Sequence, residues 1–361
     1  MTIFGHGFLP YHIEVQAQPG SVGDIRDRVK ALKARLREAG TYPGFPQSLV
    51  NDLRQVTGVI DVKQEGPQSA VLIPLRMAKG IAGETCELSA VLGTGPIAEQ
   101  IEMVLREWDI SLTVSKRISE GDSPLEFSIR DSNGAHESVR LYPISRSRFR
   151  STLSEMASTP DHLILNRYNQ GLYQLAQLVA GHGGVVSLRP RQFGQYDSVE
   201  DYLRMLPSTE QLVLSTRHSV LTTLARKAGF QPPRQWPHDV NALSDEHGTR
   251  LAASLFAQMP KDSIIVFTLY PQHSTVFYHQ HYSPVTLEAP RNIDTSSRAA
   301  RLQGSLLGHS LQLRQQRIPF AEQSEWRAFC EQVMDDAFTG TEQRPWIYPS
   351  YISTEQRRMP R

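Results

Sequence analysis

The sequence lacks several features that would place a protein in a specialised class. Only two of its 361 residues are cysteines, Cys86 and Cys330, too few for a disulfide framework and in no metal-ligand spacing. No apolar run approaches the roughly 18 residues that a membrane helix needs. The first residues also lack the basic stretch and apolar core of a secretory signal. We therefore expect a protein of the reducing cytoplasm with no membrane partner.

The sequence also lacks an excess of charge of either sign. Lys and Arg number 38 and Asp and Glu 37, a formal net charge of +1, so nothing indicates a nucleic-acid partner. It contains no internal repeat, zinc spacing, P-loop or nucleophile elbow. A chain of this length can bury a large core, which fits one large α/β domain.

The second half of the chain alternates between strand and helix signals, which favours βαβ units and a mostly parallel sheet. The expected strands are 163–165, 184–188 and 211–214, and the expected helices are 169–179, 202–206 and 219–228.

Two local patterns in the first half predict further elements. Residues 21–39 form the clearest helix, with Ser21 as its cap, an apolar stripe and Gly40 at its end. Strands 110–116 and 125–130 are followed by a turn at 131–134, and residues 138–142 pair back as a hairpin.

The most informative stretch is 263–313. Residues 264–269 form an apolar strand, 270–273 a turn and 274–278 a second strand, so a hairpin is expected. A polar segment at 283–291 and the stretch 292–297 follow, and a mostly helical segment with a leucine-rich stripe comes next. This order resembles the C-terminal half of the ribokinase-like (PfkB) family of sugar and nucleoside kinases. Thr268-Leu269 and Ser274 match its first motif, and Asp294-Thr295 and Gly304 match its second.

The resemblance implies a three-layer α/β fold, with a mostly parallel sheet flanked by helices and a small β lid. It implies a single domain over residues 1–340, with lid segments at about 108–145, the helix at 21–39 as an insertion, and a C-terminal tail at 341–361. The nucleotide- or anion-binding candidates are Thr268, Ser274, Thr295, Ser297 and Arg298. The substrate-pocket candidates are Ser69, Gly95, Arg189, Arg191 and Arg217.

The chain departs from the family pattern at the positions that perform chemistry. The catalytic Asp of the family, which deprotonates the substrate hydroxyl, falls on Ala300. Because an alanine side chain cannot accept a proton, the contribution of general-base catalysis is lost, which lowers the reaction rate roughly 10²–10⁴-fold. The family's substrate-binding Asn and Asp fall on Ser69 and Gly95, and the acidic residue that helps organise the metal falls on His218. Asp294 is the remaining candidate for a substitute base.

These departures leave three functions open. The first is a pseudokinase that serves as a binding or scaffold module, for a protein partner or a small anionic ligand. The second is an active sugar or nucleoside phosphotransferase with displaced catalytic groups, which would need ATP and magnesium. The third is a different group transfer on the same scaffold.

Two further expectations concern oligomeric state and metal binding. Exposed lid strands near Ile110 and residues 125–142 favour a homodimer. His279 and His281 share one face of a strand and could bind a metal with His273, but no carboxylate or cysteine stands nearby, so we expect no metal site.

Overall fold

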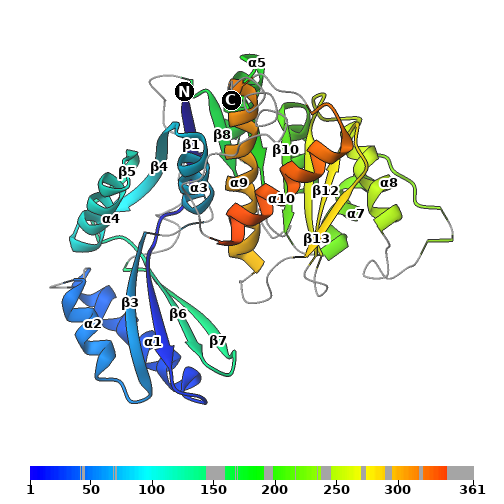
Figure 1. Cartoon of the computed structure of the whole chain (residues 1–361). Helices are drawn as coiled ribbons and strands as arrows, with labels where there is room; N and C mark the ends of the chain where they lie inside the picture. Colours follow the sequence, from blue (N-terminus) through cyan, green and yellow to red (C-terminus); the bar gives the residue numbers. More distant parts are fainter. Residues whose placement is uncertain are drawn as a thin grey trace, which may run out of the picture. The chain divides into compact units, whose positions relative to one another are not determined.

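The computed structural model describes residues 1–40, 42, 45–67, 69, 71–143, 159–166, 168, 170–190, 198–215, 217–233, 235–236, 245–269, 274–288, 295–316 and 320–339 (Figure 1). The chain divides into two compact units. The first unit comprises Met1–Gly5, Ile73–Thr85 and Ala157–Arg361, and the second comprises His6–Leu72 and Cys86–Met156.

The first unit is built on a mostly parallel sheet. Its strands follow the order β13-β12-β11-β10-β9-β8-β1. β1, β8, β9, β10 and β11 run parallel to their neighbours, whereas β12 and β13 are antiparallel. The bounds are β1 Thr2–His6, β8 His162–Leu165, β9 Val186–Leu188, β10 Gln211–Ser215, β11 Ile264–Leu269, β12 Ser274–His279 and β13 Val285–Glu288.

Helices bury the faces of this sheet. Every residue of β8 and β9 is buried, as expected for parallel strands covered on both faces. α9 packs on β9, β10 and α10, and Figure 1 shows it lying along the strands. The helices of the first unit are α3 Leu72–Ala82, α5 Gln170–Gly181, α6 Val199–Met205, η2 Leu206–Ser208 (3₁₀), α7 Arg217–Lys227, α8 Asp245–Phe256, α9 Thr295–Gln316 and α10 Gln323–Thr339.

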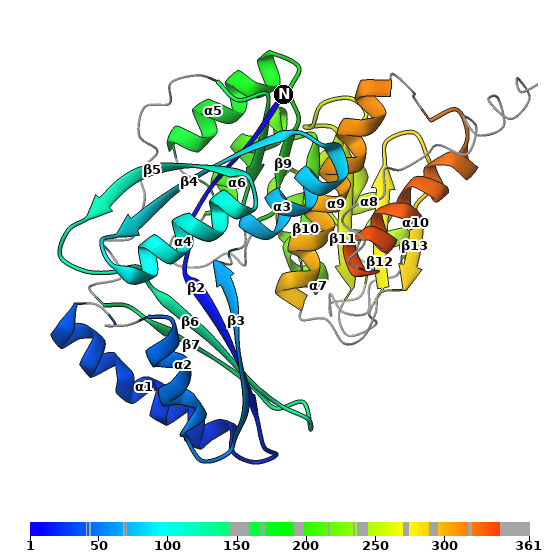
Figure 2. The ribbon, with the colours of Figure 1, turned by 60° about the vertical axis from the view of Figure 1, so that its left-hand side comes forward.

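The second unit contains a small four-stranded sheet in the order β3-β2-β6-β7 (Figure 2). β2 pairs in parallel with β6, and the other pairs are antiparallel. Alternate residues of β2 are buried, while α1 packs on β6 and β7 and α2 packs on β3. The bounds are β2 Tyr11–Ala17, α1 Val22–Ala39, α2 Gln47–Arg54, β3 Val59–Pro67, β6 Leu125–Asp131 and β7 His136–Leu141.

The same unit also contains a βαβ segment. β4 (Thr85–Gly93) leads into α4 (Pro96–Glu107), which returns to β5 (Ile110–Ile118). β5 pairs in parallel with β4 and not with the small sheet, so the expected lid range of 108–145 is wrong for this strand. The reason is topological, because a strand that follows a crossover helix pairs beside the strand before that helix.

The structure confirms most of the local predictions. β11 and β12 form the expected hairpin, and β6 and β7 form the other. The helix expected at 21–39 is α1, and Gly40 follows it in the left-handed conformation, with a φ of 68°. The predicted cap is wrong, because the side chain of Ser21 makes no capping hydrogen bond. The expected tail at 341–361 lies outside the described residues.

The crossing of α9 over α3 depends on two glycines one turn apart. A Cβ atom added at Gly304 would lie 2.5 Å from the carbonyl oxygen of Pro74 and 2.6 Å from its Cα. One added at Gly308 would lie 2.7 Å from the Cβ of Ile81. The two helix backbones are therefore so close that only glycine, whose side chain is a hydrogen atom, fits at these two positions. Gly304, which the sequence placed in a family motif, has a packing role here.

This crossing gives a stability prediction. Gly304→Ala should lower the free energy of unfolding by about 1–3 kcal/mol, because the added methyl group forces the helices apart. Gly181→Ala, at the end of α5 with open space around it, is the matched control and should change stability by less than about 1 kcal/mol. Urea unfolding of both variants measures the difference, and equal stabilities would contradict the packing role.

A second prediction concerns pH. His279 is 8% exposed and lies among aromatic rings, with centroids 4.9 Å from Tyr282 and 5.1 Å from Trp326. Burial lowers its pKa from 6.5 to about 4, with His281 lowering it further and Asp262 opposing the shift. Between these two pH values the unfolded chain binds a proton that the folded chain does not, so stability should fall as the pH drops from 6.5 to 4.

The contribution of His279 to this loss is at most about 3 kcal/mol. His279→Gln, which stays neutral, should flatten the dependence of unfolding free energy on pH in that window. Urea unfolding of both proteins at several pH values measures this. An identical slope for wild type and variant would show that His279 is not the responsible group.

Candidate functional site

The best-defined polar cluster in the first unit lies where its parallel strands end. The carboxyl ends of parallel strands share one edge of a sheet, and ligands of open α/β folds bind in the crevice there. Asn166 directly follows β8 and Arg189 directly follows β9, and both are buried. At the end of β10, Ser215 pairs in register with Thr268 of β11. These four residues therefore mark one edge.

α9 begins at this same edge. In this helix, the side chain of Gln303 donates two hydrogen bonds from its Nε2. One goes to the carbonyl oxygen of Leu165 at 3.1 Å and the other to that of Ser187 at 2.9 Å, near the ends of β8 and β9. More than two turns later, Arg314 donates to the carbonyl oxygen of Gly183, which precedes β9. The helix thus runs opposite to the strands, and its first turns lie at their carboxyl ends.

Arg189 is the charged residue of the cluster. Its side chain is 3% exposed, and its Nε donates to Oε1 of Gln303 at 3.2 Å. Its backbone N–H donates to the carbonyl oxygen of Leu165 at 2.8 Å. Both the backbone and the guanidinium group are therefore held in place. A charge buried in this way is costly unless an opposite charge or several hydrogen bonds satisfy it.

The nucleotide- or anion-binding candidates of the sequence divide between two elements. Thr268 and Ser274 lie on the two strands of the β11–β12 hairpin, where Ser274 pairs with Leu269 and is half-buried. Thr295, Ser297 and Arg298 form the first turn of α9. The structure thus brings the hairpin and the helix start into the same unit. The side chains of Thr268 and of the three helix residues lie outside the described part of the chain.

The remaining arginine candidates are described only in part. Arg217 begins α7 two residues after the end of β10, which places its backbone at the carboxyl edge. Its side chain, together with the whole of Arg191 and the substitute base Asp294, falls outside the described residues.

The position that the resemblance gives to the catalytic base is apolar. Ala300 lies in the second turn of α9 and is 1% exposed, and the preceding Ala299 is fully buried. The methyl group of Ala300 packs in the interior and has no atom that can accept a proton.

The substrate-pocket candidates Ser69 and Gly95 belong to the second unit, where both have structural roles. The Oγ of Ser69 accepts the backbone N–H groups of Val71 and Leu72, at 3.3 and 2.9 Å, and so caps the start of α3. Gly95 precedes α4 with a φ of 151°, a conformation that favours glycine.

The start of α4, which follows the loop Gly93-Thr94-Gly95, is bound by a carboxylate of the chain itself. Asp122 is fully buried and accepts the N–H groups of Ile97 and Ala98, each at 3.0 Å. It thereby neutralises the positive end of the α4 dipole and satisfies its first free donors. This helix start is already occupied by the chain's own anion.

Sequence reasoning missed three of the residues that define these features: Asn166, Gln303 and Asp122. Asn166 could have been found, because a polar residue directly after a buried strand marks the carboxyl edge. Gln303 and Asp122 act on atoms far away in sequence, and their immediate neighbours give no such signal.

His279 and His281 have partners within the chain. The Nδ1 of His279 accepts the N–H of His281 at 3.1 Å, and Nε2 of His281 lies 3.2 Å from Asp262. Within the described ranges, no group of three or more His, Cys, Asp or Glu side chains is arranged to hold a metal ion. His273 lies outside those ranges. The helices of the same ranges include none with the length and apolar character to span a bilayer.

No family model matches the sequence. A search of curated proteins also finds no match.

Comparison with solved structures, in contrast, finds many similar folds. An adenosine kinase from Schistosoma mansoni in complex with 2-fluoroadenosine has a TM-score of 0.58 and 10% sequence identity, over 97% of this chain and 98% of that one. Ribokinase from Giardia lamblia has a TM-score of 0.57 and 12% identity, over 99% and 98%. Ribokinase from Cryptococcus neoformans var. grubii serotype A in complex with ADP has a TM-score of 0.53 and 12% identity, over 98% of each chain.

The similarity covers nearly the whole of each chain, and at these identities it establishes the fold. A mostly parallel sheet flanked by helices, with a small second sheet, is the architecture that the motifs predicted. The chain therefore has the ribokinase-like fold.

Proposed function

We propose that this protein is a ribokinase-like binding module that does not transfer phosphoryl groups and holds an anionic ligand at the carboxyl edge of its first unit. The observation on which the first part rests is Ala300, a buried methyl group where the resemblance places the catalytic base. Without a proton acceptor there, the substrate hydroxyl is not activated.

The anionic character of the ligand rests on Arg189. Gln303 accepts a hydrogen bond from its guanidinium group, in an interior where charge interactions are stronger than in water. A planar guanidinium group binds carboxylate and phosphate oxygens in pairs of parallel hydrogen bonds. The backbones of Arg217 and Arg298 lie in the first turns of α7 and α9, which start at the same edge.

The donor set does not fit magnesium. That ion prefers carboxylate oxygens and water, whereas the described polar side chains of the edge are an arginine and two amides, Asn166 and Gln303. No step of the proposed function passes through a metal ion or through ATP.

We also propose that the protein is located in the cytoplasm and has a protein partner. Cys86 and Cys330 are buried as thiols and not joined in a disulfide, which supports a reducing compartment such as the cytoplasm. A protein that retains a ligand without converting it can act as a sensor or scaffold for a protein partner, since ligand binding stabilises the folded state to which the partner binds.

Calorimetric titration with ADP and with pyrophosphate, each with and without magnesium, tests the binding part. We expect saturable heat that does not require magnesium, and Arg189→Gln should weaken binding by about tenfold or more. Arg189→Lys keeps the charge and should retain part of the affinity. Arg204→Gln removes an arginine of α6 whose side chain is 65% exposed, and as the control it should bind like wild type. No heat with either anion at millimolar concentration would overturn the anionic ligand.

Incubation with magnesium and ATP, with a panel of sugars and nucleosides, tests the catalytic part. We expect no ADP production above that of the buffer. Turnover that is lost in Asp294→Ala would overturn the proposal in favour of a phosphotransferase with a displaced base, and turnover that survives this change would indicate another catalytic group.

A further inference from the structure

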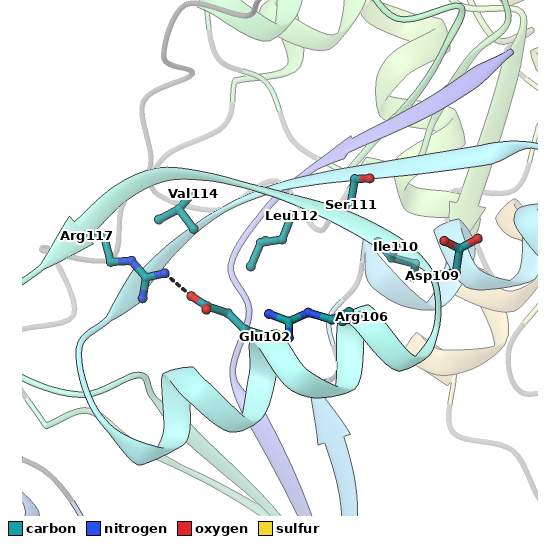
Figure 3. Close-up of a pocket in the computed structure, with 8 residues that line it drawn as sticks. All are labelled: Glu102, Arg106, Asp109, Ile110, Ser111, Leu112, Val114 and Arg117. Atoms are coloured by element: carbon teal, nitrogen blue, oxygen red, sulfur yellow. Dashed lines mark hydrogen bonds and ion pairs between the residues drawn. The ribbon is translucent and has the colours of Figure 1, made fainter.

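A shallow depression of about 360 Å³ lies between β5 and α4 in the second unit (Figure 3). Leu112 and Val114 line it from the strand, and Glu102 lines it from the helix. Arg117 pairs with Glu102 across it, so these two opposite charges offset each other within the chain. The chemically reactive group of this unit lies elsewhere, in the turn between β6 and β7.

That turn contains the dipeptide Asn133-Gly134. The sequence has six asparagines, and Asn133 is the only one that a glycine follows. In such a pair the backbone nitrogen of the glycine can attack the side-chain carbonyl carbon of the asparagine, because glycine has no Cβ atom to obstruct the approach. Whether the pair reacts in a folded protein depends on its exposure and on how its backbone is held.

The pair is open to solvent. Ser132, Asn133, Gly134 and Ala135 are all exposed. A Cβ atom added at Gly134 would meet no atom of a more distant residue within 4 Å, so the space around the attacking nitrogen is clear. Gly134 has a φ of 86°, in the left-handed region that favours glycine. Water can therefore reach both reacting groups.

The short hydrogen bonds of the turn go to the nitrogens on either side of the attacking one. Oδ1 of Asp131 accepts the N–H groups of Asn133 and Ala135, at 3.0 and 2.9 Å. The N–H of Gly134 donates to the carbonyl oxygen of Asp131 at 3.3 Å, which is beyond the usual range for such bonds. Because an exposed turn opens locally at little cost in free energy, this nitrogen is readily released.

From this geometry we propose that Asn133 is a site of spontaneous covalent modification, with water as the co-reactant. The nitrogen of Gly134 loses its proton and forms a bond with Cγ of Asn133, and the side-chain nitrogen leaves as ammonia. The product is a five-membered succinimide ring. Water then opens the ring. Attack at the main-chain carbonyl gives isoaspartate, and attack at Cγ gives aspartate.

Either product changes the turn in a way that its neighbours would sense. A new carboxylate at position 133 stands near that of Asp131, and the two repel each other. Isoaspartate also adds a methylene group to the main chain of the turn, whose length sets the register of the hairpin. Oδ2 of Asp131 accepts the N–H of Gly20 at 3.3 Å, in the loop before α1. The modification should therefore loosen the hairpin tip and its contact with that loop.

Peptide mapping of the full chain, aged in mildly alkaline buffer, tests the proposal. The peptide that contains Asn133 should change in mass from amide to acid and accept a methyl group from an isoaspartate methyltransferase. Its conversion should be faster than in mildly acidic buffer, because the attacking nitrogen must lose a proton. Asn51 is also exposed but lies within α2, so conversion at Asn133 should exceed that at Asn51 by about tenfold or more.

Asn133→Gln is the matched variant. It keeps an amide at the same place, but its extra methylene group requires a six-membered ring, so the methyl acceptor should disappear from this peptide. A sample aged in guanidinium chloride gives the reactivity of the unfolded chain. Three results would each overturn the proposal: an Asn133 that reacts only when the chain is unfolded, equal conversion at Asn51, or an unchanged methyl signal in Asn133→Gln.

Discussion

The position of the candidate site depends on how one buried amide, Gln303, is satisfied. Its nitrogen donates to two neighbouring strands and its oxygen accepts from Arg189, so three bonds fix the helix relative to the sheet. The next residue, Gly304, lies about 100° further round the helix and lets that side touch α3. A buried amide without these partners would cost about 1–3 kcal/mol. Satisfying Gln303 therefore places the first turns of α9 at the carboxyl ends of the strands.

Features encoded by neighbouring residues could be predicted from the sequence, and features that depend on distant contacts could not. The hairpin of β11 and β12 follows from a continuous apolar run, a turn and a second run, all within 16 residues. The role of Asp122 depends on N–H groups 24 and 25 residues away, and that of Gln303 on a carbonyl group 138 residues away. The sheet to which β5 belongs was mistaken because its own sequence fits either sheet. Of the candidate site, Arg189 was predicted from the family resemblance, whereas Asn166 and Gln303 were not.

The start of α4 and the carboxyl edge of the first unit differ in the charge that the chain itself places there. At α4 the helix start is bound by the carboxylate of Asp122, which removes its attraction for an external anion. At the edge of the first unit the buried group is a cation, Arg189, aligned by a neutral amide. The Gln303 amide orients this guanidinium group, and the proposed anionic ligand would pair with it.

The likeness to ribokinases and adenosine kinases at 10–12% identity shows which parts of a sequence a fold constrains. Buried strands need only apolar residues of suitable volume, and many sequences provide them. A helix crossing without space for a Cβ atom needs glycine, and here Gly304 and Gly308 supply it. A catalytic base is constrained by chemistry alone, so it can be lost without loss of the fold. Ala300 is compatible with the ribokinase-like architecture for this reason, because a small apolar residue there packs in the interior and leaves the position of α9 unchanged.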